Sequence, residues 1–170
     1  TAASGGTYLG EGNSYTTTIS TTTTFYAETY APGCVSASRL PVTATVNPIP
    51  DVPVGGAGDN ICSPGSITVS AAPGTDGNTV RWYTAATGGT YLGEGNAYTT
   101  TISATTTFYA ESYTSGCVST SRLPVTATLS SIPGIPVDDN GDSICGPGSI
   151  TVNASPGNNG DTVRWYATAS

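Results

Sequence analysis

Short stretches of alternating apolar and polar residues run along the chain and predict β-strands with one buried face. The predicted strands are residues 66–71, 79–83, 90–92, 97–102, 106–113 and 123–129. Turn sequences rich in Gly, Asn and Pro separate them, and no segment shows a sustained helical period. The apolar positions that face inward in this pattern are Ile67, Val69, Val80, Trp82, Val125 and Ala127.

The whole pattern recurs along the chain. The sequence TAASGGTYLGEGNSYTTTIS at Thr1 returns as TAATGGTYLGEGNAYTTTIS at Thr84, a period of 83 residues, and the alignment continues to the end without insertion or deletion. Similarity at a fixed period indicates a repeat architecture. Six or seven short strands within about 80 residues further indicate an all-β fold of tandem immunoglobulin-like β-sandwich repeats, arranged as beads on a string or as a filament.

Two Pro-rich runs mark the boundaries between repeats. NPIPDVPVGG begins at Asn47 and SSIPGIPVDD begins at Ser130, and the spacing of their prolines favours extended, semi-rigid connectors. We therefore expect residues 1–47 to be the C-terminal portion of one repeat, residues 48–130 a complete repeat, and residues 131–170 the N-terminal portion of the next.

Composition narrows the classes of function. Four arginines face eleven carboxylates, for a formal net charge of −7, so no basic surface is available to bind nucleic acid. No run approaches the roughly 20 apolar residues of a membrane-spanning helix. His, Lys and Met are absent, which removes most side chains used for catalysis at neutral pH. We expect neither an enzyme nor a membrane span in this segment, and no cofactor.

The cysteines suggest disulfides rather than a metal site, since the chain has neither a CxxC pair nor a histidine. Disulfides imply an oxidising compartment and hence an extracellular or cell-surface location. We expect Cys62 to bond Cys117 within one repeat, closing a loop of about 55 residues worth roughly 4 kcal/mol. The competing bond, Cys34 to Cys62, would span the connector. With the bond inside the repeat, the partners of Cys34 and Cys145 lie in an adjacent repeat or in the next chain.

Several motifs together carry a family resemblance. They are CSPGSITVSA, VRWYTAATGG, TTTFYAESYTSGCVS and LPVTATL. In this order they resemble the Ig-like repeats of large secreted and cell-surface proteins of Bacteroidota, including gliding-type adhesins and multidomain exported proteins. The resemblance implies a sandwich with a Cys62–Cys117 bond and a role as spacer or adhesive stalk. The resemblance does not point to any particular ligand.

Two candidate sites lie near the second connector and its repeat. Asp138, Asn140 and Asp142 offer oxygen ligands at alternate positions, as a calcium loop does, whereas the simpler interpretation is a polar turn. Ser143 and Thr162 each follow an Asp and precede an apolar residue, a pattern for which the resemblance implies O-glycosylation.

Other side chains invite a binding or catalytic interpretation. Glu94 and Glu111 could form the carboxylate pair of a glycosidase, but we interpret them as solvated turn and strand residues. Tyr83, Tyr91 and Tyr98 could stack on a sugar, although most tyrosines of so small a sandwich must serve its core. Arg81 lies beside Trp82 and should pair with a carboxylate or cover a Tyr ring.

These observations favour a non-catalytic structural module of an extracellular stalk, fibre or filament. The alternatives are an adhesin domain that binds a surface glycan or protein, and an ancillary domain of a secreted hydrolase. The expected partners are further copies of the same repeat, either in the same chain or joined head to tail.

Overall fold

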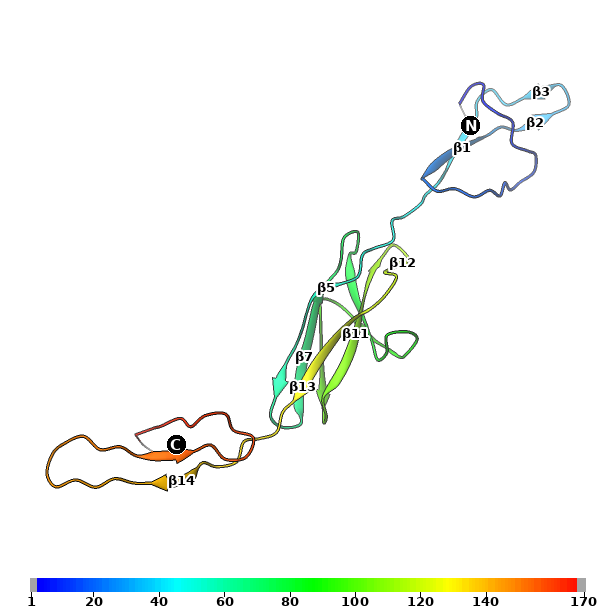
Figure 1. Ribbon diagram of the computed structural model, residues 1–170. Coiled ribbons are helices and arrows are strands. Elements are labelled where there is room, and N and C mark those ends of the chain that lie inside the picture. The colour runs from blue at the N-terminus through cyan, green and yellow to red at the C-terminus, as the bar shows by residue number, and fades with distance from the viewer. Residues whose placement is uncertain (1–2, 168–170) are drawn as a thin grey trace.

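The computed structural model describes residues 3–167, apart from the side chains of residues 138–140. Its regular elements are all strands, and none of the described residues lies in a helix. The strands are β1 (Thr23–Ala27), β2 (Tyr30–Ala31), β3 (Cys34–Val35), β4 (Leu40–Ala44), β5 (Val54–Gly58), β6 (Asn60–Ile61), β7 (Gly65–Ala72), β8 (Thr79–Tyr83), β9 (Tyr91–Glu94), β10 (Ala97–Ile102), β11 (Thr106–Thr114), β12 (Cys117–Val118), β13 (Leu123–Leu129), β14 (Val137–Asn140) and β15 (Asn153–Ser155). Figure 1 shows three portions that follow one another along an extended path.

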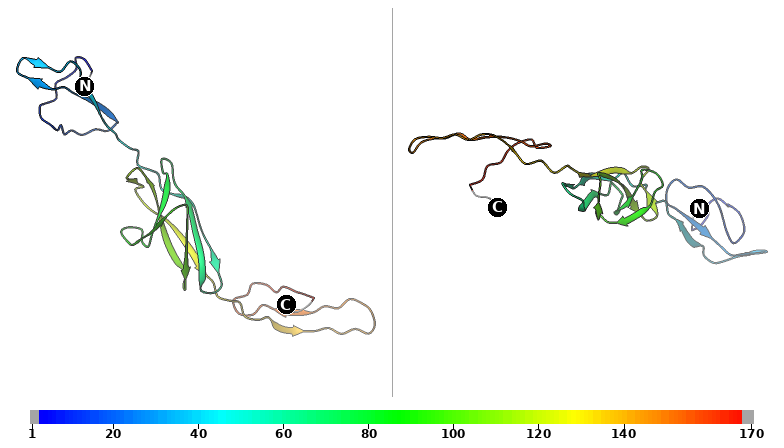
Figure 2. Two further views of the ribbon diagram at one scale, coloured as in Figure 1. Left: turned by 180° about the vertical axis from the view of Figure 1, so that it is seen from behind. Right: turned by 90° about the horizontal axis from the view of Figure 1, so that it is seen from below.

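The central portion is a two-layer sandwich formed by β5 to β13. One sheet has the order β10-β7-β5, and the other has the order β6-β13-β11-β8-β9, with β12 paired to β11. The pairs are antiparallel except for β13 with β6. The two further views in Figure 2 show the connectors leaving this sandwich at opposite ends. The predicted all-β, Ig-like sandwich is confirmed.

The core lies between the two sheets, where alternate side chains of each strand meet. The six predicted core residues are all buried, with at most 3% of any of them exposed. Ala71, Ile102, Phe108 and Ala110 complete the cluster. Trp82 is the largest fully buried side chain, and its indole Nε1 donates to the carbonyl oxygen of Gly95 at 2.9 Å, so its polar atom is satisfied.

Strand β5 was not predicted, because its sequence VGGAG has no apolar alternation and its start falls in the Pro-rich run. Its small residues permit a close approach of the opposite sheet. A Cβ added at Gly56 would lie 2.9 Å from Cγ2 of Val125 on β13. Glycine is therefore required here for packing, which a hydrophobicity pattern does not reveal.

The flanking portions each contain a strand pair that is equivalent to a pair of the central sandwich. β1 and β4 pair Thr23 with Ala44, as β11 and β13 pair Thr106 with Ala127. β14 and β15 likewise correspond to β5 and β7. Among the described residues, no opposing sheet covers the β1–β4 pair or the β14–β15 pair. Their core positions are consequently exposed: Val42 is 50% exposed and Val152 is 46% exposed, whereas their central equivalents Val125 and Val69 are buried.

The connector after the central sandwich is hydrogen-bonded at both ends. Ser130 N donates to Ile61 O at 2.8 Å on the preceding side, and Gly134 N donates to Asn158 O at 2.7 Å on the following side. The same contact occurs one period earlier, where Asp51 N donates to Thr75 O at 2.9 Å. Only residues 131–133 therefore separate the two anchoring points.

Candidate functional site

The most buried charged group of the central sandwich is an ion pair between Arg122 and Glu111. Arg122 Nε lies 3.1 Å from Glu111 Oε1, and the side chains are 11% and 10% exposed. Nη1 of the same arginine donates to the carbonyl oxygens of Ala85 and Gly88 at 2.8 and 2.7 Å. Its guanidinium carbon lies 3.4 Å from the centre of the Tyr83 ring. The group fixes the loop after β8 to the sheet.

A second arginine lies on the same sheet. Arg81 Nε donates to Glu94 Oε2 at 3.0 Å, and its guanidinium carbon lies 3.2 Å from the centre of the Tyr113 ring. Desolvation lowers the pKa of Arg81, but the hydrogen bond to Glu94 and the charges of Tyr113 and Glu94 outweigh it, so the pKa is raised. The predicted role of Arg81, pairing with a carboxylate or covering a Tyr ring, is confirmed in both parts.

Glu94 and Glu111 are not arranged as the carboxylate pair of a glycosidase. Glu94 and Glu111 each have an arginine partner. The interpretation of Glu111 as solvated is wrong, because its side chain is buried against Arg122 and only 8% of the residue is exposed. Each carboxylate neutralises a cation that holds strands and loops together, which is a structural role.

The raised pKa of Tyr83 predicts how the stability of the central sandwich responds to alkaline pH. Burial, followed by the charge and hydrogen bond of Glu111, raises the Tyr83 pKa above its usual 10.0. The folded state thus holds this proton more tightly, and the resulting stability is complete below about pH 10 and disappears as the pH rises through the folded-state pKa. Denaturant unfolding of wild type and Tyr83→Phe at pH 9 and 11 should show a smaller decline for the variant. An equal decline in both proteins would contradict this assignment.

The tyrosines proposed for sugar stacking do not form a common platform. Tyr83 meets Tyr91 edge-on, with planes at 65°, and Tyr83 is covered by Arg122. Tyr98 packs edge-on against Phe108 at a centroid distance of 5.7 Å. Of these three tyrosines, only Tyr91 is exposed. Two of the rings therefore serve packing within the sandwich.

The four cysteines are not arranged as expected. All are free thiols; Cys34, Cys62 and Cys145 are exposed and Cys117 is half-buried. Cys62 directly follows β6, which pairs with Thr128 and Leu129 at the end of β13. Cys117 pairs with Thr114 at the far end of β11.

The strand β11 alone separates those two ends by about 27 Å, whereas disulfide formation requires Cα atoms within about 7 Å. The predicted Cys62–Cys117 bond is therefore incompatible with the fold. The competing Cys34–Cys62 bond within one chain is also excluded, because Cys34, the equivalent of Cys117, lies on the β2–β3 hairpin, beyond the first connector from Cys62 (Figure 1).

The candidate calcium ligands are only partly described, since the side chains of Asp138 and Asn140 lie outside the description. Asp142 accepts hydrogen bonds from the backbone N of Ser143 at 2.8 Å and of Thr151 at 3.3 Å. Its equivalent Asp59 accepts the same bond from Thr68 N at 2.7 Å. In the central copy this carboxylate bonds to strand β7, and in the third portion the equivalent carboxylate makes the same backbone contact two residues before β15. Within the described residues, no three acidic, Cys or His side chains form a metal cluster.

The candidate glycosylation positions Ser143 and Thr162 are both exposed. Exposure is a requirement for modification by a glycosyltransferase, and glycosylation of these hydroxyls remains a prediction. Neither hydroxyl group is needed by the central sandwich, because both residues belong to the third portion of the chain.

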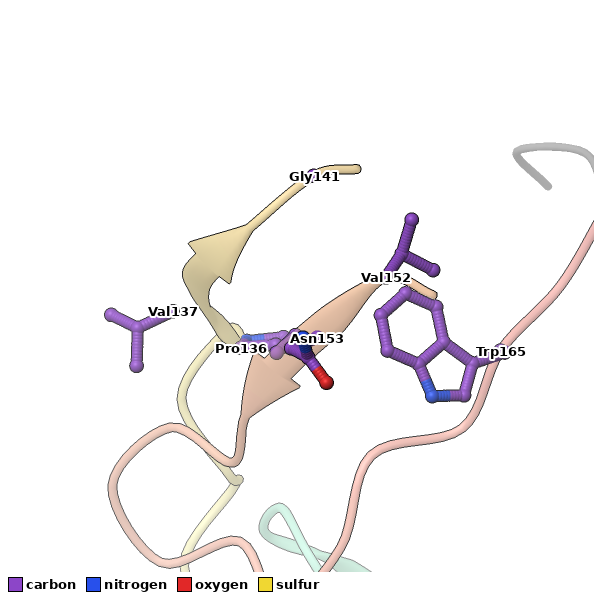
Figure 3. A pocket seen from close by; sticks show the side chains of 7 residues that line it. Pro136, Val137, Gly141, Val152, Asn153 and Trp165 are labelled. Carbon is purple, nitrogen blue, oxygen red and sulfur yellow. The ribbon is translucent and has the colours of Figure 1, made fainter. Parts of the chain in front are cut away.

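The cavities described in the structure lie in the flanking portions. One of about 350 Å³ is bounded by Val152, Asn153 and Trp165. Figure 3 shows the Trp165 ring beside Val152. The equivalent tryptophan, Trp82, is fully buried, so this cavity is an unfilled core position and not a ligand pocket. A second cavity, beside Arg39 and Glu28, occupies the position that corresponds to the Arg122–Glu111 pair.

Sequence reasoning missed the buried polar residues near one end of the sandwich. Ser112 is fully buried, and its Oγ accepts from Gly74 N at 3.0 Å. Ser119 Oγ accepts from Ser112 N at 3.1 Å and donates to Ser121 O at 2.9 Å. Glu and Arg recur at the same separation in both copies, as Glu28 with Arg39 and Glu111 with Arg122, which was a signal for the ion pair. Ser119 recurs as Ser36, whereas Ser112 is replaced by Thr29.

No helix of the described residues is both long and apolar enough to span a membrane. A search of curated proteins finds no match to the chain. A family described as "Ig-like domain CHU_C associated" matches residues 1–48 and 50–130, about three quarters of the sequence. The β-sandwich and this match agree, and the chain belongs to the family of CHU_C-associated Ig-like domains.

Proposed function

We propose that this chain is a structural repeat module of an extracellular stalk or fibre, which holds other parts of an assembly at a fixed spacing. Membership of an Ig-like family supports a structural, extracellular domain in general terms. The more specific proposal is carried by the connector, whose two ends are hydrogen-bonded to Ile61 and Asn158. A connector anchored on both sides transmits orientation from one repeat to the next.

The flanking portions support an array made of further copies. Residues 1–47 carry β1 and β4, the equivalents of β11 and β13 in the sheet that faces β5 and β7, and residues 131–170 carry β14 and β15, the equivalents of β5 and β7. Each exposes the core positions that the other would cover. In a continuous array the adjoining stretch of chain supplies the missing half, and between separate chains another copy supplies it head to tail.

The proposal predicts a narrow distribution of angles between successive repeats. Electron micrographs of the native assembly should show stiff rods, since the connector has only three residues between its anchors. Gly74→Ala should broaden the distribution, because its Cβ would lie 2.5 Å from the carbonyl oxygens of Asp51 and Val52 and displace the connector.

The matched control is Gly65→Ala, whose Cβ would have no neighbour closer than 3.7 Å and should leave the angles unchanged. Repeats that hinge freely in the wild-type assembly would contradict the spacer function. In that case the hydrogen bonds at the two ends of the connector would not fix the angle between successive repeats in the assembly.

A further inference from the structure

Each complete repeat carries its two cysteines at opposite ends. Cys62 lies at the end from which the chain leaves for the next repeat, directly after Ile61, which accepts a hydrogen bond from Ser130 N. Cys117 lies at the end that the chain enters from the preceding repeat, on the β11–β12 hairpin. Figure 1 shows β12 near the connector from the first portion. In any array, a Cys62 end of one repeat thus faces a Cys117 end of the next.

One connector position contacts both ends. Ser130 Oγ donates to Asn60 Oδ1 at 2.8 Å, in addition to the bond from its backbone N to Ile61. Its equivalent one period earlier, Asn47, donates from Nδ2 to Ser115 O at 3.5 Å. Ser115 is two residues before Cys117, and Ile61 is one residue before Cys62. The position is thus seen against the Cys62 segment at one junction and against the Cys117 segment at the other, and by the repeat period we infer that both segments meet it in a longer array.

The β11–β12 hairpin places Cys117 directly after the turn at that end of the sandwich. Thr114 pairs with Cys117 across the two-residue turn Ser115-Gly116, whose φ values are 44° and 86°. Both positive values belong to a tight type I′ turn, which fixes the direction of β12. Cys62 is exposed and Cys117 is half-buried, so both thiols are accessible to an oxidant.

We propose that the cysteine at the Cys62 position forms a disulfide with the cysteine at the Cys117 position of the following repeat. The proposal rests on the proposed function in requiring consecutive repeats. The two thiols lose two protons and two electrons and form one S–S bond, while an oxidant of the disulfide class, such as glutathione disulfide, is reduced to two thiols. Cys145 lies one period after Cys62 and occupies the same position in its repeat, and Cys34 likewise corresponds to Cys117.

The bond would give every junction a second covalent path beside the three-residue connector. A stalk linked in this way stays continuous when a connector is cleaved by a protease. It also explains why the cysteines lie at the ends of the sandwich, where a bond within one repeat is impossible.

The test lengthens the full chain by one period, with a second copy of residues 48–130 inserted after Ser130. In the junction variant, the remaining thiols are Cys62 of the first complete repeat and Cys117 of the second, with every other cysteine replaced by Ser. The matched control keeps Cys62 and Cys117 of the first repeat. Both proteins are oxidised with glutathione disulfide, free thiols are counted by absorbance, and intact masses are measured. Near-ultraviolet circular dichroism verifies that each protein is folded.

The junction variant should lose both thiols and two hydrogens of mass while remaining monomeric, and the control should keep both thiols. Closure of the control, or a folded junction variant that stays reduced, would overturn the proposal. The failure of the spacer function is distinguishable, because freely hinging repeats in micrographs contradict stiffness without altering the thiol count. If the thiols stayed reduced while micrographs showed stiff rods, only the disulfide proposal would be contradicted.

Discussion

Trp82→Ala should remove a large part of the stability of the central sandwich. Trp82 is fully buried between the sheets, and truncation of a buried Trp typically costs about 3–5 kcal/mol through lost burial and the cavity left behind. A small domain has a total stability of about 5–15 kcal/mol. Denaturant unfolding followed by circular dichroism should therefore show a midpoint shifted to much lower denaturant.

Trp165→Ala is the matched control, since the same residue occupies the equivalent position one period later. Trp165 is 59% exposed in the described structure, so its truncation should leave the unfolding of the central sandwich unchanged in dilute solution. Where copies associate, Trp165 should become buried and its fluorescence should shift to shorter wavelength. Equal destabilisation by the two substitutions would contradict the assignment of the core.

The sequence predicted this core because strands with one buried face leave a clear alternation. Residues 79–83, 97–102 and 123–129 were expected as strands with the bounds that the structure shows for β8, β10 and β13. Strands β5, β6 and β12 were missed. β5 is glycine-rich, and the other two have only two residues each, too short to show a period.

The cysteine pairing was wrong for a different reason. Order along the chain placed Cys62 before the first predicted strand and Cys117 before the last, which suggested proximity within one repeat. Strand direction decides the matter instead. β6 runs parallel to the end of β13, and β12 folds back on the end of β11, so the two residues lie at opposite ends. A hydrophobicity pattern contains no information on which end of a sheet a loop reaches.

The buried ion pair could not be predicted from local pattern, because Glu111 lies on β11 and Arg122 lies in the turn before β13. In the sequence, Glu111 lies within a stretch typical of an ordinary strand, and Arg122 lies in a polar turn. Their contact depends on the adjacency of β11 and β13 and on the loop that supplies the carbonyl oxygens of Ala85 and Gly88. Only the assembled sheet brings these groups together.

Arg122→Met should destabilise the central sandwich by about 3 kcal/mol, the second large effect that we expect. The substitution leaves the Glu111 carboxylate without its cation in a position that is only 8% exposed, and breaking a buried ion pair typically costs about 3–5 kcal/mol. It also removes the donors to Ala85 and Gly88, so the loop after β8 should become more sensitive to proteolysis. Denaturant unfolding and limited proteolysis measure the two effects.

The first portion supplies the control, because Arg39 pairs with Glu28 in the same way but with side chains 26% and 35% exposed. Solvent screens that pair, so Arg39→Met should cost no more than about 1 kcal/mol. The double variant Arg122→Met with Glu111→Gln should recover part of the loss, since no carboxylate remains unpaired. If Arg122→Met proved as mild as Arg39→Met, burial would not be what gives this ion pair its strength, and the loop after β8 would have to be held by its backbone alone.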